Sequence, residues 1–136
     1  MKHTPLYDAH VAHAGKIVDF AGWAMPLQYS GVLDEYHAVR NTAGLFDVSH
    51  MGRIQVIGKG ALAYLQCVTT NDIEKIGLLN SQYSMICNEE GGVKDDIFIY
   101  RLAEEKFLLC VNASNREKIF NWLQQQRKKQ ALSVKI

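Results

Sequence analysis

Three strand-like runs in the second half of the chain constrain its fold most strongly. They are QYSMICN at 82–88, DDIFIYRL at 95–102 and KFLLCVN at 106–112. The turn-forming stretches EGG at 90–92 and AEE at 103–105 separate them. Such short connections join strands that run in opposite directions, whereas parallel strands need crossovers of a dozen or more residues. The pattern therefore predicts an antiparallel meander.

Helices and further strands are expected on both sides of this meander. Thr4 and Pro5 form a good helix start, because a hydroxyl can cap a helix and proline suits its first position. Ser114 and Glu117 have the spacing of a capping box. We expect helices at about 5–14, 32–42 and 59–68 and from 114 onward, strands at 16–20 and 48–57, and an aromatic-rich loop at 21–29. The fold class predicted is α+β with a mostly antiparallel sheet.

The last residues alternate like the start of another strand. They read LSVKI at 132–136. An unpaired strand edge is prone to aggregation, so a strand in this position calls for a following segment that pairs with it. We therefore expect residues 1–136 to be the first part of a longer protein.

Charge and cysteine content exclude several classes of function. The net charge is +1 over 136 residues, and the only basic cluster is 127–129, so no surface for nucleic acid or an acidic membrane is expected. Cys67, Cys87 and Cys110 lack the spacing of a zinc site, and three unpaired thiols suit a reducing compartment. No segment has the length of a signal peptide core or a membrane span. The sequence predicts a cytoplasmic protein without a metal.

Asp95 and Asp96 form the clearest candidate for an acidic site. Adjacent residues of a strand point to opposite faces, so only one of the two can face a concave site or the sheet interior. The alternative is a pair of solvated hairpin carboxylates, and the pattern alone favours that alternative.

Two groups of histidines admit a chemical interpretation and a simpler one. Asp47, Ser49 and His50 could suggest a catalytic triad, but triads are built from separated segments, and a turn explains this stretch. His10 and His13 lie one helical turn apart and could share a metal, but no third ligand is evident and an ordinary helix face explains them.

Four aromatic residues with polar tips could line a pocket for a flat heterocycle. They are Trp23, Tyr29, Tyr83 and Tyr100. Packing in the core or at its rim is the explanation that the residues alone favour. The residues by themselves thus lead to an α+β domain with a candidate acidic pocket.

Several longer stretches, taken in order, resemble one family. They are TPLY at 4–7, VDFAGWAMPLQY at 18–29, GLFDVSHMG at 44–52, TND at 70–72, YSM at 83–85, NEEGG at 88–92, DD at 95–96 and VNASN at 111–115. Each motif is weak alone, but the ordered set resembles the aminomethyltransferases, the T-proteins of the glycine cleavage system. The resemblance covers essentially the whole chain.

This resemblance implies a reaction and a site. T-proteins take a methylene group from an aminomethyl-dihydrolipoyl arm carried by the H-protein, pass it to tetrahydrofolate and release ammonia. The resemblance implies that Asp96 is the catalytic acidic residue at the reactive end of the folate, where a carboxylate can orient the pterin and stabilise positive charge. It also places Met51, Tyr83, Asn112 and Ala113 beside Asp96 in the folate pocket.

The family fold implied is a duplicated α+β unit whose halves exchange strands. Residues 1–136 match the N-terminal part of this folate-binding domain, and family members are more than twice as long. We therefore expect the lipoyl-carrying H-protein and the missing C-terminal part, or a split partner that replaces it, as partners. Little activity is expected from this chain alone.

Two readings without catalysis remain beside the enzymatic one. The chain could be a folate-binding module that transfers no one-carbon group. It could also be a self-pairing fragment, in which two copies exchange edge strands as a homodimer.

Overall fold

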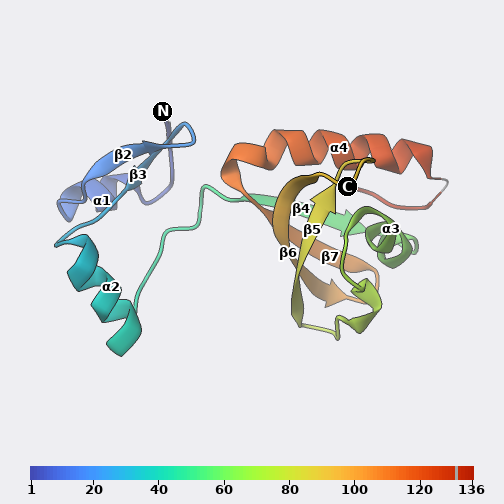
Figure 1. Cartoon of the computed structure of the whole chain (residues 1–136), viewed down its shortest axis with the longest axis horizontal. Helices are drawn as coiled ribbons and strands as arrows, with labels where there is room; N and C mark the ends of the chain where they lie inside the picture. The colour runs from blue at the N-terminus through green and yellow to red at the C-terminus, as the bar shows by residue number, and fades with distance from the viewer. Residues whose placement is uncertain (131) are drawn as a thin grey trace. The chain divides into compact units, whose positions relative to one another are not determined.

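The computed structural model describes residues 1–130 and 132–136, which divide into two compact units (Figure 1). The first unit is Met1–His50 and the second is Met51–Ile136. No helix in these described ranges is long and apolar enough to cross a membrane.

The first unit contains a small three-stranded sheet with two helices. The sheet order is β1-β3-β2, formed by β1 (Lys2–His3), β2 (Ile17–Phe20) and β3 (Trp23–Pro26). The helices are α1 (Tyr7–Ala12) and α2 (Val32–Asn41). The expected helices and the strand at 16–20 are present, with ends shifted by at most two residues.

The aromatic segment 21–29 is not the loop that was expected. Its residues 23–26 form β3, which pairs antiparallel with β2 from Phe20↔Trp23 to Ile17↔Pro26. Ala21 and Gly22 form the two-residue turn, with φ of 53° and 80°. Two positive φ values are what a tight hairpin turn of this length requires. The turn was missed because alanine rarely adopts this conformation.

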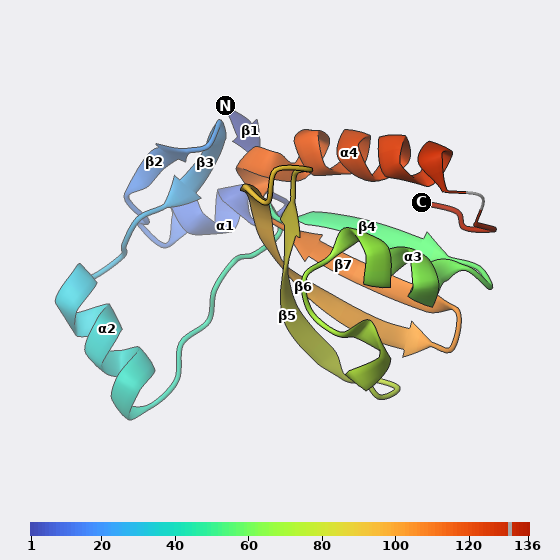
Figure 2. The same cartoon turned by 45° about the vertical axis from the view of Figure 1, so that its right-hand side comes forward.

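The second unit is a four-stranded antiparallel sheet with the strand order β4-β7-β6-β5 (Figure 2). Its strands are β4 (Gly52–Ile57), β5 (Ser81–Cys87), β6 (Val93–Ala103) and β7 (Lys106–Val111). The predicted meander is therefore confirmed as β5-β6-β7. β4 begins four residues later than predicted and pairs antiparallel with β7, which places β4 at the edge of the sheet.

Helices α3 (Ala61–Val68) and α4 (Arg116–Lys129) complete the second unit with the short 3₁₀ helices η1 (Ile73–Lys75) and η2 (Ala113–Asn115). The buried residues of α3, α4 and the strands form one hydrophobic cluster. Tyr64 of α3 donates a buried hydrogen bond of 2.7 Å to the carbonyl of Leu123 in α4. Both helices thus pack against the same face of the sheet, and the α+β class is confirmed.

The other face of this sheet carries partly exposed side chains. Along β6, Asp95, Ile97 and Ile99 are buried, while the alternate residues Asp96, Phe98 and Tyr100 are exposed. This alternation is the period-2 pattern of a strand covered on one face only. The polar and aromatic side chains on this face of β6 are therefore accessible to a ligand.

Both predicted helix caps are wrong. The hydroxyl of Thr4 does not cap α1, because it donates a hydrogen bond of 2.7 Å to Oδ2 of Asp47. Ser114 lies inside η2, and α4 begins at Arg116 without a side-chain cap. At the C-terminal end, the expected strand is reduced to one antiparallel bridge, in which Lys135 and Ile57 exchange two hydrogen bonds of 2.8 Å.

Candidate functional site

Asp95 and Asp96 point to opposite faces of β6, as the strand rule predicted. Asp95 is 3% exposed and faces the helices, whereas Asp96 lies on the open face. The interpretation of a solvated carboxylate pair is wrong for Asp95, because neutral amide groups of Asn112 and Asn115 donate hydrogen bonds to it inside the unit. Asp96 is therefore the carboxylate that an incoming ligand can reach.

The carboxylate of Asp96 is held by one donor at each oxygen. The hydroxyl of Tyr83 donates a hydrogen bond of 3.1 Å to Oδ2, and Nδ2 of Asn112 donates one of 2.9 Å to Oδ1. The hydrogen bond to Asp96, followed by burial and by the charge of Asp96, raises the pKa of Tyr83. The hydroxyl consequently stays protonated and remains a donor near neutral pH.

Strand register explains why residues distant in sequence meet here. Met85 pairs with Asp96, and the side chain of Tyr83 lies on the same face two residues along β5. Phe98 pairs with Cys110, so Asn112 at the end of β7 falls beside Asp96. Antiparallel register thus places a hydroxyl and an amide on either side of one carboxylate.

Met51 and Ala113 lie at the same end of the sheet. Gly52 pairs with Val111, so Met51 precedes β4 directly across from Asn112, which follows β7. Ala113 is the first residue of η2. All five residues that the family resemblance singled out therefore belong to the second unit: Met51, Asn112 and Ala113 lie where β4 begins and β7 ends, and Asp96 and Tyr83 lie on the neighbouring strands β6 and β5.

An aromatic surface adjoins Asp96 on the open face. The ring centroids of Tyr83 and Phe98 lie 5.5 Å apart at an interplanar angle of 67°, and those of Phe98 and Tyr100 lie 6.4 Å apart. A surface of this kind, next to a carboxylate, suits a flat heterocycle with ring N–H donors. The sequence prediction missed Phe98, although its place two residues after Asp96 on the strand could have revealed it. Trp23 and Tyr29 belong to the first unit.

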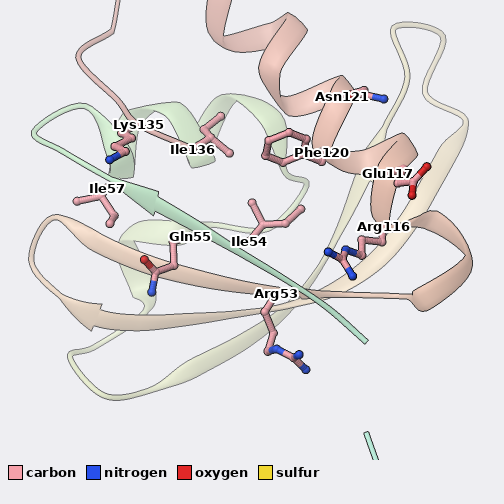
Figure 3. A pocket seen from close by; sticks show the side chains of 10 residues that line it. All are labelled: Arg53, Ile54, Gln55, Ile57, Arg116, Glu117, Phe120, Asn121, Lys135 and Ile136. Atoms are coloured by element: carbon pink, nitrogen blue, oxygen red, sulfur yellow. The ribbon is translucent and has the colours of Figure 1, made fainter. Parts of the chain in front are cut away.

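A separate hollow of about 600 Å³ lies beside β4 and the first turns of α4 (Figure 3). Figure 3 shows Arg53 and Arg116 among the residues that line the hollow, and Ile54, Phe120 and Ile136 supply apolar walls. None of the predicted folate-pocket residues lines this hollow.

In the first unit, a buried hydrogen-bond network surrounds Asp47. Its Oδ2 lies 2.8 Å from Nε2 of His10, and Nδ1 of His10 lies 2.7 Å from the hydroxyl of Tyr29. Burial opposes ionisation of Asp47, but hydrogen bonds from Ser49, His10 and Thr4 outweigh it and hold its pKa well below the usual range. The network ties residues 4, 10, 29 and 47 together.

The triad interpretation of Asp47, Ser49 and His50 is wrong. The imidazole partner of Asp47 is His10, and the backbone N–H of Ser49 donates to Oδ1 of Asp47 at 2.9 Å, as in a turn. The ring of His50 instead packs edge-on against Phe20, with centroids 5.6 Å apart. A proton-transfer chain from serine to histidine to aspartate is therefore not formed.

The metal interpretation of His10 and His13 also fails. His10 is engaged with Asp47 and Tyr29, while Nδ1 of the exposed His13 lies 2.8 Å from the carbonyl of Ala9. Within residues 1–130 and 132–136, no group of three or more His, Cys, Asp or Glu side chains could hold a metal ion.

Comparison with known proteins identifies the family. The family described as GCVT N-terminal domain matches residues 6–136. The chain belongs to this family. An aminomethyltransferase of Desulfitobacterium hafniense (strain DSM 10664 / DCB-2) is 52% identical over 126 residues, which cover 93% of this chain and 34% of the relative. An aminomethyltransferase of Chloroherpeton thalassium is 54% identical over 125 residues, which cover 92% of this chain and 34% of the relative.

A solved structure has the same fold. The crystal structure of glycine cleavage system aminomethyltransferase T from Bartonella henselae superposes with a TM-score of 0.91 at 40% identity, covering 98% of this chain and 37% of that one. The resemblance to the N-terminal part of aminomethyltransferases is therefore confirmed. The chain spans about a third of the length of the relatives it matches.

Proposed function

We propose that residues 1–136 form the N-terminal part of the folate-binding domain of a glycine cleavage aminomethyltransferase. The whole protein would transfer a methylene group from the aminomethyl-dihydrolipoyl arm of the H-protein to tetrahydrofolate, with release of ammonia. The observation that carries this proposal is the carboxylate of Asp96, exposed on an aromatic sheet face and held between Tyr83 and Asn112. Membership of the GCVT family supports it.

The residues around Asp96 fit the chemistry of a pterin. A reduced pterin presents ring N–H groups on its edge and a flat apolar face. Asp96 accepts hydrogen bonds from such an edge, while Tyr83 and Phe98 offer aromatic surface to the face. Met51 and Ala113, at the same end of the sheet, would close the pocket from the side of β4 and η2.

The proposed catalytic role of Asp96 follows from its charge and its fixed position. Once a ring nitrogen of the folate has bonded to the methylene carbon and ammonia has left, departure of the lipoyl sulfur as a thiol leaves an iminium-like cation, with positive charge on the methylene carbon and the ring nitrogen. A negative carboxylate that is already oriented by Tyr83 and Asn112 stabilises that charge without reorganisation. Asp96 would also orient the pterin for attack.

A titration of tetrahydrofolate into the chain under anaerobic conditions tests the site. Asp96→Asn removes the charge, and Glu104→Gln removes one charge from the exposed turn at the far end of β6 as the matched control. We expect Asp96→Asn to weaken binding about tenfold or more, because hydrogen bonds to charged groups are the strong ones. Equal affinity of both variants for tetrahydrofolate would remove Asp96 from the site.

Catalysis is tested in a longer protein, since this chain spans 34% of its relatives. Residues 1–136 would be joined to the remaining segment of the Desulfitobacterium hafniense relative, and ammonia release from aminomethylated H-protein would be measured. We expect turnover by the chimera and its loss in Asp96→Asn. Turnover that survives this substitution contradicts the catalytic role.

Self-association by strand exchange is the second candidate, favoured by one observation. Among the described residues, β4 pairs with β7 on one edge and has only the Ile57–Lys135 bridge on the other. A second copy could donate its C-terminal residues to this edge. Sedimentation equilibrium showing a strict monomer over a wide concentration range would exclude this candidate.

A further inference from the structure

The proposed function leaves the buried carboxylate of Asp95 without a role. Its Oδ2 accepts a hydrogen bond of 3.0 Å from the backbone N–H of Asn112. Its Oδ1 accepts one of 3.0 Å from Nδ2 of Asn112 and one of 2.6 Å from Nδ2 of Asn115. All three donors are neutral amides. A carboxylate that is 3% exposed is costly to bury, so a purely structural contact would be made more cheaply by a neutral side chain.

The amide of Asn112 connects this buried carboxylate to the exposed one. Its Nδ2 lies 3.0 Å from Oδ1 of Asp95 and 2.9 Å from Oδ1 of Asp96, with the carbonyl of Asp96 at 3.1 Å. An ionised carboxylate only accepts hydrogen bonds, so both carboxylates require the NH₂ group of Asn112 rather than its oxygen. The orientation of this amide is thus determined from both faces of the strand.

We propose that Asp95 is a positioning residue that acts through Asn112 on Asp96. It holds the amide of Asn112 so that Nδ2 donates to Asp96, and the carboxylate of Asp96 keeps one orientation on the open face. The inference rests on the proposed function in one respect, namely that Asp96 is the carboxylate of the site.

The charge of Asp95 matters because it excludes the orientation of the Asn112 amide in which the oxygen, and not Nδ2, faces residue 95. In Asp95→Asn, the new amide can place its own NH₂ group toward Asn112, where two donors would face each other. Asn112 relieves this conflict by rotating its amide until the oxygen takes the place of Nδ2, the position that faces both residue 95 and Asp96. Once its oxygen faces Oδ1 of Asp96, two acceptors repel, and Asp96 turns away. A change of almost no volume at a buried position therefore disturbs the exposed carboxylate.

Nuclear magnetic resonance of the labelled 136-residue chain tests this directly. Couplings across hydrogen bonds should connect Nδ2 of Asn112 to the carboxyl carbons of both Asp95 and Asp96 in the wild-type protein. In Asp95→Asn, the coupling to Asp96 should disappear, and the NH₂ protons of Asn112 should exchange with solvent about tenfold faster or more. A wild-type spectrum in which Asn112 couples to Asp96 alone overturns the proposal, even if Asp95→Asn does not fold.

Two further variants separate positioning from general stability. Asn115→Ala removes another donor to Asp95 but does not face Asp96, so the coupling between Asn112 and Asp96 should persist. Asp96→Asn should leave Asn112 coupled to Asp95, because Asp95 holds the amide of Asn112 from the buried face of the sheet. Loss of the Asn112–Asp96 coupling in Asn115→Ala, or its retention in a folded Asp95→Asn protein, overturns the proposal.

Tetrahydrofolate binding adds a second, independent readout. In a double-mutant cycle, Asp95→Asn should lower the affinity about tenfold when Asp96 is present and leave it unchanged in the Asp96→Asn background. A purely structural role of Asp95 would give the same loss in both backgrounds and contradicts the proposal. If the folded chain does not bind tetrahydrofolate, the proposed function fails for this chain, while the positioning of Asn112 is still decided by the couplings.

Discussion

The hydroxyl of Tyr83 on β5 donates a hydrogen bond of 3.1 Å to Oδ2 of Asp96 on β6. Asn112 occupies the other oxygen of the same carboxylate. These two donors come from β5 and from the residue that follows β7, the strands on either side of β6, so the orientation of Asp96 depends on the register of these three strands. The exposed carboxylate is consequently prearranged before any ligand arrives, which lowers the entropy lost on binding.

Tyr83→Phe should weaken tetrahydrofolate binding with little effect on stability. The substitution keeps the aromatic ring and removes only the donor to Oδ2 of Asp96, on a side chain that is 49% exposed. We expect an affinity loss of about five- to tenfold by calorimetry and an unchanged urea midpoint. Phe98→Leu is the control. This variant loses the ring contact with Tyr83, but it keeps both donors that orient Asp96. Equal affinity of wild type and Tyr83→Phe would contradict this role of the hydroxyl.

The ionisation of Tyr83 should shift to lower pH in Asp96→Asn. The hydrogen bond to Asp96, burial and the negative charge of Asp96 all raise the pKa of Tyr83, and the substitution removes the first and the last of these causes. The tyrosine ring carbons can be followed by nuclear magnetic resonance through an alkaline titration. A Tyr83 titration that is the same in both proteins would show that the hydrogen bond is absent in solution.

The second unit could be predicted largely from its sequence, for physical reasons that are local. The period-2 alternation in 95–102 and the glycine turn at 91–92 specify strand direction and face within a few residues. The opposite faces of Asp95 and Asp96 follow from the same rule. The grouping of Tyr83, Asn112 and Asp96 was implied by the family resemblance, and the register of three strands gives it a physical basis.

The parts that could not be predicted depend on contacts between distant residues. Thr4 was expected to cap a helix, but Asp47, which lies 43 positions away, takes its hydroxyl. Asp95 was expected in solvent because its donors, Asn112 and Asn115, come 17 and 20 positions later. In both cases a hydrogen bond to a residue distant in the sequence outweighed the local preference of the side chain, and a single sequence does not reveal such a contact.

Asp47→Asn should destabilise the first unit at neutral pH and much less in acid. The pKa of Asp47 is held well below its usual range in the folded protein, so the stabilisation is present above the unfolded pKa and is lost as pH falls through the folded one. We expect a loss of about 1–3 kcal/mol at pH 7. The difference between variant and wild type should narrow as the pH is lowered below about 4.

Fluorescence can measure this unit by itself, because Trp23 lies in the first unit and Trp122 in the second. Urea unfolding would be followed in a Trp122→Phe background, in which Trp23 is the remaining tryptophan. Asp19→Asn provides a carboxylate control in the same unit, because Asp19 is an exposed residue of β2 whose carboxylate accepts a hydrogen bond from the backbone N–H of Gly22. A difference between Asp47→Asn and wild type that is constant from pH 7 to strongly acidic pH would contradict the linkage.

Tyr64→Phe should destabilise the second unit and leave its site unchanged. Tyr64 is fully buried between α3 and α4, burial raises its pKa far above the usual value, and its hydroxyl donates to the carbonyl of Leu123. The variant loses this buried hydrogen bond and keeps the ring, so we expect a loss of about 1–2 kcal/mol in the free energy of unfolding.

The measurement is urea unfolding followed by Trp122 fluorescence, with Trp23 replaced by phenylalanine. Tyr100→Phe is the matched control, because its hydroxyl lies on the partly exposed face and its removal should change stability by less than about 0.5 kcal/mol. The couplings of Asn112 to Asp95 and Asp96 should be unchanged in Tyr64→Phe, since α3 and α4 cover the face of the sheet opposite to Asp96. A larger loss in Tyr100→Phe than in Tyr64→Phe would mean that the open face, and not the helix-covered face, holds the unit together.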